Sequence, residues 1–137
     1  MSYAGDVTPE QAWSVLHDEP GAVLVDVRTR AEWSYVGLPD LSATGKDVVL
    51  VEWQRYPDGA VNAGFTAELE AAGVPKDAPV FFLCRSGVRS VAAAEAATRD
   101  GWTRSHNVLD GFEGPHDDQR HRSVAGWKVA GLPWVQG

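Results

Sequence analysis

The chain has 137 residues, 44% of them hydrophobic and 23% charged, and its formal net charge at pH 7 is −7. This length and composition predict one globular domain and exclude a disordered chain. The acidic balance argues against a nucleic-acid partner, because phosphate contacts need clustered lysine and arginine.

Cysteine usage and the N-terminal segment indicate the cellular compartment. The single cysteine, Cys84, cannot form an internal disulfide and provides no paired-cysteine metal spacing. That usage is typical of a reducing compartment. The segment 1–6 lacks a basic and then apolar stretch, and no apolar run approaches the roughly 20 residues of a membrane span. We therefore expect a cytoplasmic protein that does not contact membranes.

The first elements along the chain are a helix and a buried strand. Thr8 can cap a helix in which Pro9 takes the first position and Gln11 completes a capping box. The nearly continuous apolar run 22–27 predicts a strand buried on both faces of a parallel sheet. Asp26 interrupts that run, and a buried carboxylate must be paired. We expect Asp26 to bind neighbouring loop amides rather than to act in catalysis.

The next segment carries candidate binding residues. Arg28 and Glu32 have the i,i+4 spacing of an ion pair within one helical turn, and we expect this pair to support the fold rather than to bind a ligand. Residues 33–47 predict a short helix followed by a loop, and 48–52 the next buried strand. Ligands of open α/β sheets bind beyond the carboxyl ends of the strands, so the residues after this strand are candidates for a pocket wall. They are Trp53, Arg55 and Tyr56, and the alternative is that the aromatic residues only cover the sheet edge.

The centre of the sequence combines an apolar strand with a cysteine. Residues 65–72 predict a helix that Gly73 ends, and 80–83 predict a central strand that stops at Cys84. An alanine-rich helix follows from residue 91, then a strand over 105–109 and a tight turn at Asp110-Gly111. Because strands and helices alternate, we predict a three-layer α/β domain with helices on both faces of a parallel sheet.

The loop between the central strand and the alanine-rich helix is the candidate active site. A helix N-terminus attracts anions and favours ionisation of a thiol placed there. Gly87 permits a tight turn that points amides inward, and Arg85 and Arg89 add two cations. A cysteine after an apolar run is usually a small buried hydrophobe, but such a residue would not need cationic neighbours. Cys84 is therefore our candidate nucleophile, and the candidate binding residues are Arg85, Ser86, Gly87, Val88, Arg89 and Ser90.

The polar connector 112–123 is a candidate metal site. His116, Asp117, Asp118 and His121 could supply ligands, but their spacing fits no closed tetrahedral pattern and no cysteine joins them. We expect a solvated loop there, with no metal and no cofactor.

Four segments in order carry a family resemblance. These segments resemble single-domain rhodaneses, the thiosulfate-type sulfurtransferases. They are the early strand and turn 24–28, the loop 84–90, the late strand and glycine turn 107–112, and the closing segments 126–128 and 130–134. The resemblance runs from about residue 5 to residue 134, which we expect to be the core of the domain, and it implies a five-stranded, mainly parallel sheet. It also implies transfer of a sulfane sulfur from an anionic donor such as thiosulfate to cyanide or a thiol, through a Cys84 persulfide, with the loop amides and arginines binding the anion.

Two alternatives remain open. One is a persulfide carrier or binding module that serves a partner protein. The other is a cysteine-based phosphatase or arsenate reductase, which is disfavoured because such phosphatase loops place their arginine six positions after the cysteine. Here Arg89 follows Cys84 by five positions, and the chain has no second thiol to resolve an arsenate intermediate.

Overall fold

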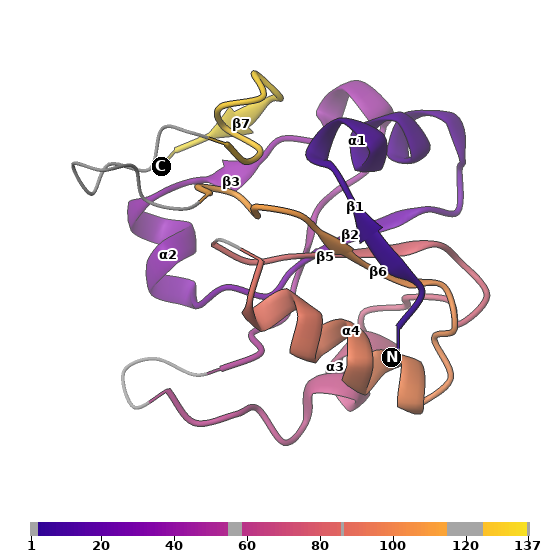
Figure 1. Ribbon diagram of the computed structural model, residues 1–137. Coiled ribbons are helices and arrows are strands. Elements are labelled where there is room, and N and C mark those ends of the chain that lie inside the picture. The colour runs from indigo at the N-terminus through magenta and orange to yellow at the C-terminus, as the bar shows by residue number, and fades with distance from the viewer. Residues whose placement is uncertain (1–2, 55–58, 86, 115–124, 137) are drawn as a thin grey trace.

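A parallel β-sheet forms the centre of the computed structural model, which describes residues 3–54, 59–85, 87–114 and 125–136. The strands run in the order β1-β6-β5-β2-β4, and every neighbouring pair is parallel (Figure 1). Their bounds are β1 Gly5–Val7, β2 Val23–Asp26, β4 Val49–Leu50, β5 Val80–Leu83 and β6 Ser105–Val108. The predicted five-stranded parallel sheet is confirmed.

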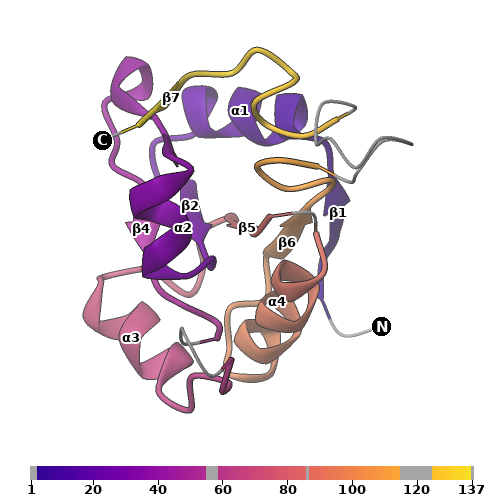
Figure 2. The same cartoon turned by 90° about the vertical axis from the view of Figure 1, so that its left-hand side faces the viewer.

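Helices cover both faces of this sheet, as predicted. Helix α1 (Pro9–Asp18) lies on one face, and α3 (Phe65–Ala71) and α4 (Arg89–Arg99) lie on the other (Figure 2). The short helix α2 (Arg30–Tyr35) follows β2, and a 3-10 turn, η1, spans Ser42–Thr44. Within the ranges that the structure describes, no helix is long and apolar enough to cross a membrane.

Two apolar clusters fill the space between the layers, and β5 contributes to both. Alternate side chains of a strand point to opposite faces. Val80, Phe82 and Cys84 therefore pack toward α3 and α4, while Phe81 and Leu83 pack toward α1. Because β5 is buried along its whole length, its position in the sheet is fixed, and so is the position of the residue that follows its carboxyl end.

Capping boxes fix the starts of two helices, and only the first of them was predicted. The capping box of Thr8 and Gln11 is present at the start of α1, as predicted. The helix expected after residue 33 begins instead at Arg30, three residues earlier. Thr29 and Glu32 form a second capping box there, with the Glu32 carboxylate accepting the Thr29 N–H at 3.2 Å. That box fixes the helix start upstream of the apolar residues from which it was predicted.

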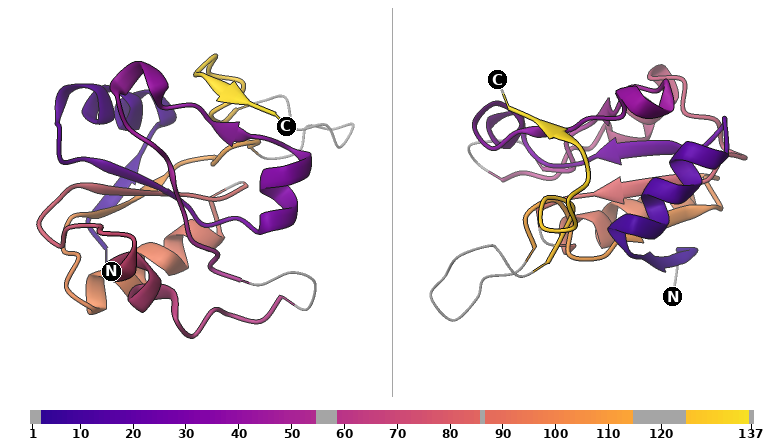
Figure 3. Two further views of the ribbon diagram at one scale, coloured as in Figure 1. Left: turned by 180° about the vertical axis from the view of Figure 1, so that it is seen from behind. Right: turned by 90° about the horizontal axis from the view of Figure 1, so that it is seen from above.

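Three short strands were not predicted. β1 has no apolar run and exists because it pairs with β6. β3 (Leu38–Pro39) and β7 (Trp134–Val135) form an antiparallel ribbon outside the main sheet (Figure 3). A Cβ on Gly37 would lie 2.7 Å from the Val135 carbonyl oxygen, so this ribbon requires glycine at residue 37. The ribbon ties the C-terminal segment to the chain that follows α2.

Candidate active site

The Cys84 thiol lies at the carboxyl end of β5, between β2 and β6. Its side chain is 1% exposed and continues the alternation of β5 toward α4. The Gly87 N–H points at the sulfur, with 3.0 Å between N and Sγ. Gly87 has φ +103°, a conformation that side chains rarely adopt, so the turn that delivers this amide depends on glycine.

Helix α4 starts closer to the cysteine than predicted. It begins at Arg89, with Val88 as its cap, rather than at residue 91. Arg89 and Ser90 therefore belong to its first turn. Its opening amides lack partners within the helix and add positive potential around the sulfur. The loop that separates the strand from the helix runs only from Cys84 to Val88.

Arg89 forms a two-pronged ion pair with Glu32 of α2. Its Nη1 and Nη2 atoms lie 2.7 and 2.9 Å from the two carboxylate oxygens. Burial alone would raise the pKa of Glu32, but the hydrogen bonds and charge of Arg89, together with Thr29, lower that pKa from 4.5 to about 2. Burial opposes the charge of Arg89 too, yet Glu32, Cys84 and Asp26 raise the pKa of Arg89 above its usual value. The guanidinium thus stays charged beside Cys84.

The predicted pair of Arg28 and Glu32 is wrong. Arg28 turns back to Asp26 and binds both carboxylate oxygens, with Nη2 to Oδ2 at 2.7 Å. Both side chains are fully buried, and the guanidinium also donates to the Gly37 carbonyl and lies 4.2 Å from the centre of the Phe112 ring. Asp26 accepts one loop amide, that of Arg28, so the expected amide contact is present. The Asp26 carboxylate also accepts the hydrogen bonds of the Arg28 guanidinium. Arg28 is therefore not available to Glu32, which pairs with Arg89.

A second loop supports the cysteine loop from behind. The Phe112 N–H donates to the Cys84 carbonyl at 2.8 Å, and the Glu113 N–H donates to the Arg85 carbonyl at 2.9 Å. A Cβ on Gly111 would lie 2.3 Å from the Cys84 carbonyl oxygen, so the two backbones touch at this glycine. The backbone N–H of Trp127 in turn donates to the Gly111 carbonyl at 2.8 Å. The predicted glycine turn and closing segment therefore meet directly behind the site.

Polar side chains adjoin the buried side of the sulfur. The Ser90 Oγ lies 3.2 Å from the Cys84 Sγ and 2.5 Å from the Asn107 Oδ1. The Asn107 Nδ2 donates to Asp6 at 3.0 Å, and Tyr3 donates to the same Asp6 oxygen at 2.8 Å. Ser90 was predicted from the sequence, whereas Asn107 and Asp6 were not, because they lie on strands whose pairing brings together residues 101 positions apart.

The other predicted residues fall into three groups. Arg85 and Val88 are exposed on the loop. Trp53 packs edge-on against Phe65, with the ring centres 5.1 Å apart, and so contributes to the core. The remaining candidates, Ser86, Arg55, Tyr56 and the histidines and aspartates of 116–121, lie outside the described residues. Within the described ranges, no group of three or more His, Cys, Asp or Glu side chains could hold a metal.

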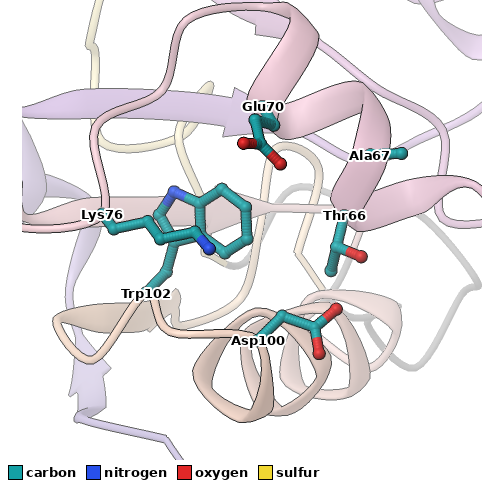
Figure 4. Close-up of a pocket in the computed structure, with 6 residues that line it drawn as sticks. All are labelled: Thr66, Ala67, Glu70, Lys76, Asp100 and Trp102. Atoms are coloured by element: carbon teal, nitrogen blue, oxygen red, sulfur yellow. The ribbon is translucent and has the colours of Figure 1, made fainter.

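A second candidate site is a cavity of about 270 Å³ between α3 and the end of α4 (Figure 4). Lys76 extends across the Trp102 ring, with the ammonium 4.8 Å from the ring centre. Glu70 of α3 and Asp100 at the end of α4 lie on either side. None of the six lining residues is a cysteine or histidine, and Trp102 is buried by its own packing. This cavity offers no nucleophile comparable with Cys84.

Comparison with known proteins places the chain in a family. A family model described as the STR4 middle domain matches residues 4–137. The thiosulfate sulfurtransferase GlpE of Glaesserella parasuis is 30% identical over 112 residues, which cover 80% of this chain and 83% of GlpE. The chain belongs to the rhodanese-like family.

Two further matches extend over nearly the whole rhodanese-like chain. The protein RC0915 of Rickettsia conorii is 39% identical over 129 residues, covering 94% of this chain and 95% of RC0915. The crystal structure of Rv0390 from M. tuberculosis has a TM-score of 0.93 and 58% identity, covering 99% of this chain and 100% of Rv0390. The predicted family and the predicted fold are confirmed, whereas the roles of individual site residues remain predictions.

Proposed function

We propose that this rhodanese-like protein transfers a sulfane sulfur from an anionic donor, such as thiosulfate, to cyanide or a thiol through a persulfide on Cys84. The observation that carries the proposal is the position of the sulfur. Sγ lies at the end of the central strand, accepts the Gly87 N–H at 3.0 Å and faces the first turn of α4. A helix N-terminus and an inward amide favour an anionic sulfur there.

In the first step, the Cys84 thiolate attacks the outer sulfur of thiosulfate. A bond forms between Sγ and that sulfur, the sulfur–sulfur bond of the donor breaks, and its electron pair leaves with sulfite. The charge of −3 on the two reactants equals that of the persulfide and sulfite together. The step therefore balances without a cofactor, and it is covalent catalysis by an activated thiol.

In the second step, cyanide or a thiolate attacks the outer sulfur and the Cys84 thiolate leaves. A sulfur–sulfur bond is about 2 Å long, so the persulfide carries the transferable sulfur beyond the buried Sγ. Exposed Arg85 supplies a cation that can meet the incoming anion. Arg89, fixed by Glu32, supplies a second positive charge, through the field it exerts rather than through the two nitrogens it has committed to Glu32.

The same pairing argues against phosphatase chemistry. A phosphatase arginine uses a forked pair of N–H groups to hold the phosphate oxygens. In this structure both Nη atoms of Arg89 are bound to Glu32 at 2.7 and 2.9 Å. A persulfide carrier that passes sulfur to a partner protein would use the same Cys84 intermediate, and it differs only in its acceptor.

Intact-mass measurement after incubation with thiosulfate tests the proposal directly. We expect the reduced protein to gain the mass of one sulfur atom and to lose it to cyanide, with thiocyanate as the product. The matched control is Cys84→Ser, which keeps the size of the side chain and removes the only thiol. We expect no gain in mass for this variant.

Each other outcome has a definite meaning. A gain of sulfur in Cys84→Ser would exclude Cys84 as the acceptor atom. Failure of the folded, reduced wild type to take up sulfur from thiosulfate, mercaptopyruvate and persulfide donors would overturn the proposal. Hydrolysis of a phenyl phosphate by the wild type but not by Cys84→Ser would establish the phosphatase alternative instead.

A further inference from the structure

A chain of hydrogen bonds connects the protein surface to the buried cysteine. It runs from Tyr3 to Asp6, then to Asn107 across the paired strands β1 and β6, then to Ser90 and finally to Cys84. Ser90 and Asn107 are buried, while Asp6 is exposed. Asp6 and Asn107 are direct partners in the parallel register, so the sheet itself holds their side chains together.

The chemistry of Asp6 sets the direction of every bond in this chain. A carboxylate only accepts hydrogen bonds, so the Asn107 amide must turn its NH₂ group toward Asp6. The amide oxygen of Asn107 then faces Ser90. A hydroxyl has one proton, and at an oxygen–oxygen distance of 2.5 Å that proton belongs to the bond from Ser90 to Asn107.

Toward Cys84, the Ser90 oxygen therefore presents a lone pair. It can accept a hydrogen bond from the neutral thiol over the 3.2 Å that separates the two atoms. It cannot donate to the thiolate without giving up the bond to Asn107. The usual expectation for a serine beside a reactive cysteine is that it donates to the thiolate, and here the geometry points the other way.

We propose that Asp6, Asn107 and Ser90 form a positioning relay that favours the protonated state of Cys84 in the resting protein. The inference deepens the proposed function, on which it rests in taking Cys84 as the reacting group. The relay opposes the Gly87 amide and the α4 N-terminus, which favour the thiolate.

The fixed charges around the sulfur are accounted for separately. Arg89 of α4 is the cation that interacts with Cys84, and its charge is largely matched by Glu32 of α2. Asp26 at the end of β2 is matched by Arg28. Two further groups of the loop region, exposed Arg85 and half-buried Asp110, lie on the loops themselves. The relay therefore acts on top of a roughly neutral set of charges, through the direction of one hydroxyl.

The relay also distinguishes the two sulfur states of the proposed cycle. In the persulfide, Sγ is bonded to two heavy atoms and carries neither a proton nor the full negative charge. The Ser90 lone pair therefore disfavours the free thiolate without equally disfavouring the persulfide. Formation of the persulfide removes the unfavourable contact between the Ser90 lone pair and the thiolate, and release of the sulfur restores that contact.

The test is a titration of the Cys84 thiol by its ultraviolet thiolate absorbance. Each protein is compared with its Cys84→Ser counterpart, so that tyrosine and tryptophan signals cancel and the single cysteine provides the whole difference. In Asp6→Asn, the residue at position 6 can present either an oxygen or an NH₂ group. Asn107 is then free to flip, and the Ser90 proton is free to turn to the sulfur. We expect the thiolate signal of Cys84 to appear at lower pH than in the wild type, because the charged sulfur then gains a hydrogen bond.

Asp110→Asn is the matched control for loss of a carboxylate. The Asp110 amide nitrogen lies 3.4 Å from the place of a Cβ on Gly87, so this residue adjoins the cysteine loop without joining the relay. Its φ of +63° is one that asparagine tolerates well. We expect a smaller change in the pKa of Cys84 than for Asp6→Asn. An equal fall in both variants would reduce the effect to charge alone and would overturn the relay.

Ser90→Ala gives an opposite sign for the two possible roles of the hydroxyl. If Ser90 accepts from the thiol, its removal leaves the pKa of Cys84 unchanged or lower. If Ser90 donates to the thiolate, its removal raises the pKa, and that result refutes the proposal. The titration needs no sulfur donor, so failure of the relay and failure of sulfur uptake would be seen in separate measurements.

Discussion

The ion pair between Glu32 and Arg89 should show itself as acid sensitivity of the fold. The substitution Glu32→Gln removes the charge but keeps the capping box, because glutamine can also close it. A pKa of about 2 in the folded state, against 4.5 without the fold, corresponds to about 3 kcal/mol of folding free energy at neutral pH. The two side chains are 20% and 19% exposed, so solvent screens part of this. We expect Glu32→Gln to lower the free energy of unfolding by about 2 kcal/mol.

The pH dependence follows from the sign of the shift. The pKa of Glu32 is lowered by folding, so its contribution is fully present above about pH 5 and is lost as the pH falls toward 2. Urea unfolding followed by tryptophan fluorescence should therefore show a gap between wild type and Glu32→Gln at neutral pH. By about pH 3 the gap should have narrowed markedly.

Two controls assign the effect to the pair. Glu10→Gln neutralises an exposed glutamate in the first turn of α1, and we expect little change there. A double-mutant cycle with Arg89→Met measures the coupling between the partners. If the gap between wild type and Glu32→Gln were the same at neutral pH and at about pH 3, the ionised carboxylate would not be its cause, and the reasoning would be refuted.

Two other changes test the framework around the site. Arg28→Met leaves the fully buried Asp26 charge without its guanidinium partner, so we expect the free energy of unfolding in urea to fall by about 3–5 kcal/mol. The double variant with Asp26→Leu should recover much of that loss. An unchanged urea midpoint in Arg28→Met would contradict the buried pair. Gly111→Ala places a Cβ against the Cys84 carbonyl and forces a left-handed alanine, so we expect about 1–3 kcal/mol of destabilisation and loss of sulfur uptake in the mass assay. Gly21→Ala, whose Cβ would meet nothing within 4 Å, is the control, and equal effects at the two glycines would refute the contact.

Four strands of the main sheet, β2, β4, β5 and β6, and the site loop were predictable because their signals are local. Residues 80–84 form an apolar run that ends at a cysteine, and glycine and arginine follow at once. The start of α2 was also readable, since Thr29 and Glu32 have the spacing of a capping box that the prediction passed over in favour of a pair with Arg28. That error came from treating i,i+4 spacing as sufficient when a nearer carboxylate, Asp26, was available.

The rest of the site depends on contacts that leave no local mark. Glu32 and Arg89 are separated by 57 positions, and Asp6 and Asn107 by 101. β1 has only three residues, none of them in an apolar run, and its existence depends on the edge that β6 offers. Strand order, which sets these meetings, was not predicted: the family resemblance implied the number of strands, and periodicity left their order open.

The strand order has a consequence for synthesis on the ribosome. β1 leaves the ribosome before the other strands of the sheet, yet β6, its partner among the described strands, emerges about a hundred residues later. The backing of the cysteine loop is completed later still, when Trp127 reaches the carbonyl of Gly111. A nascent chain that has already released Cys84 therefore carries an ordinary exposed thiol. The surroundings of that thiol are assembled only after β6 and Trp127 have followed it out of the ribosome.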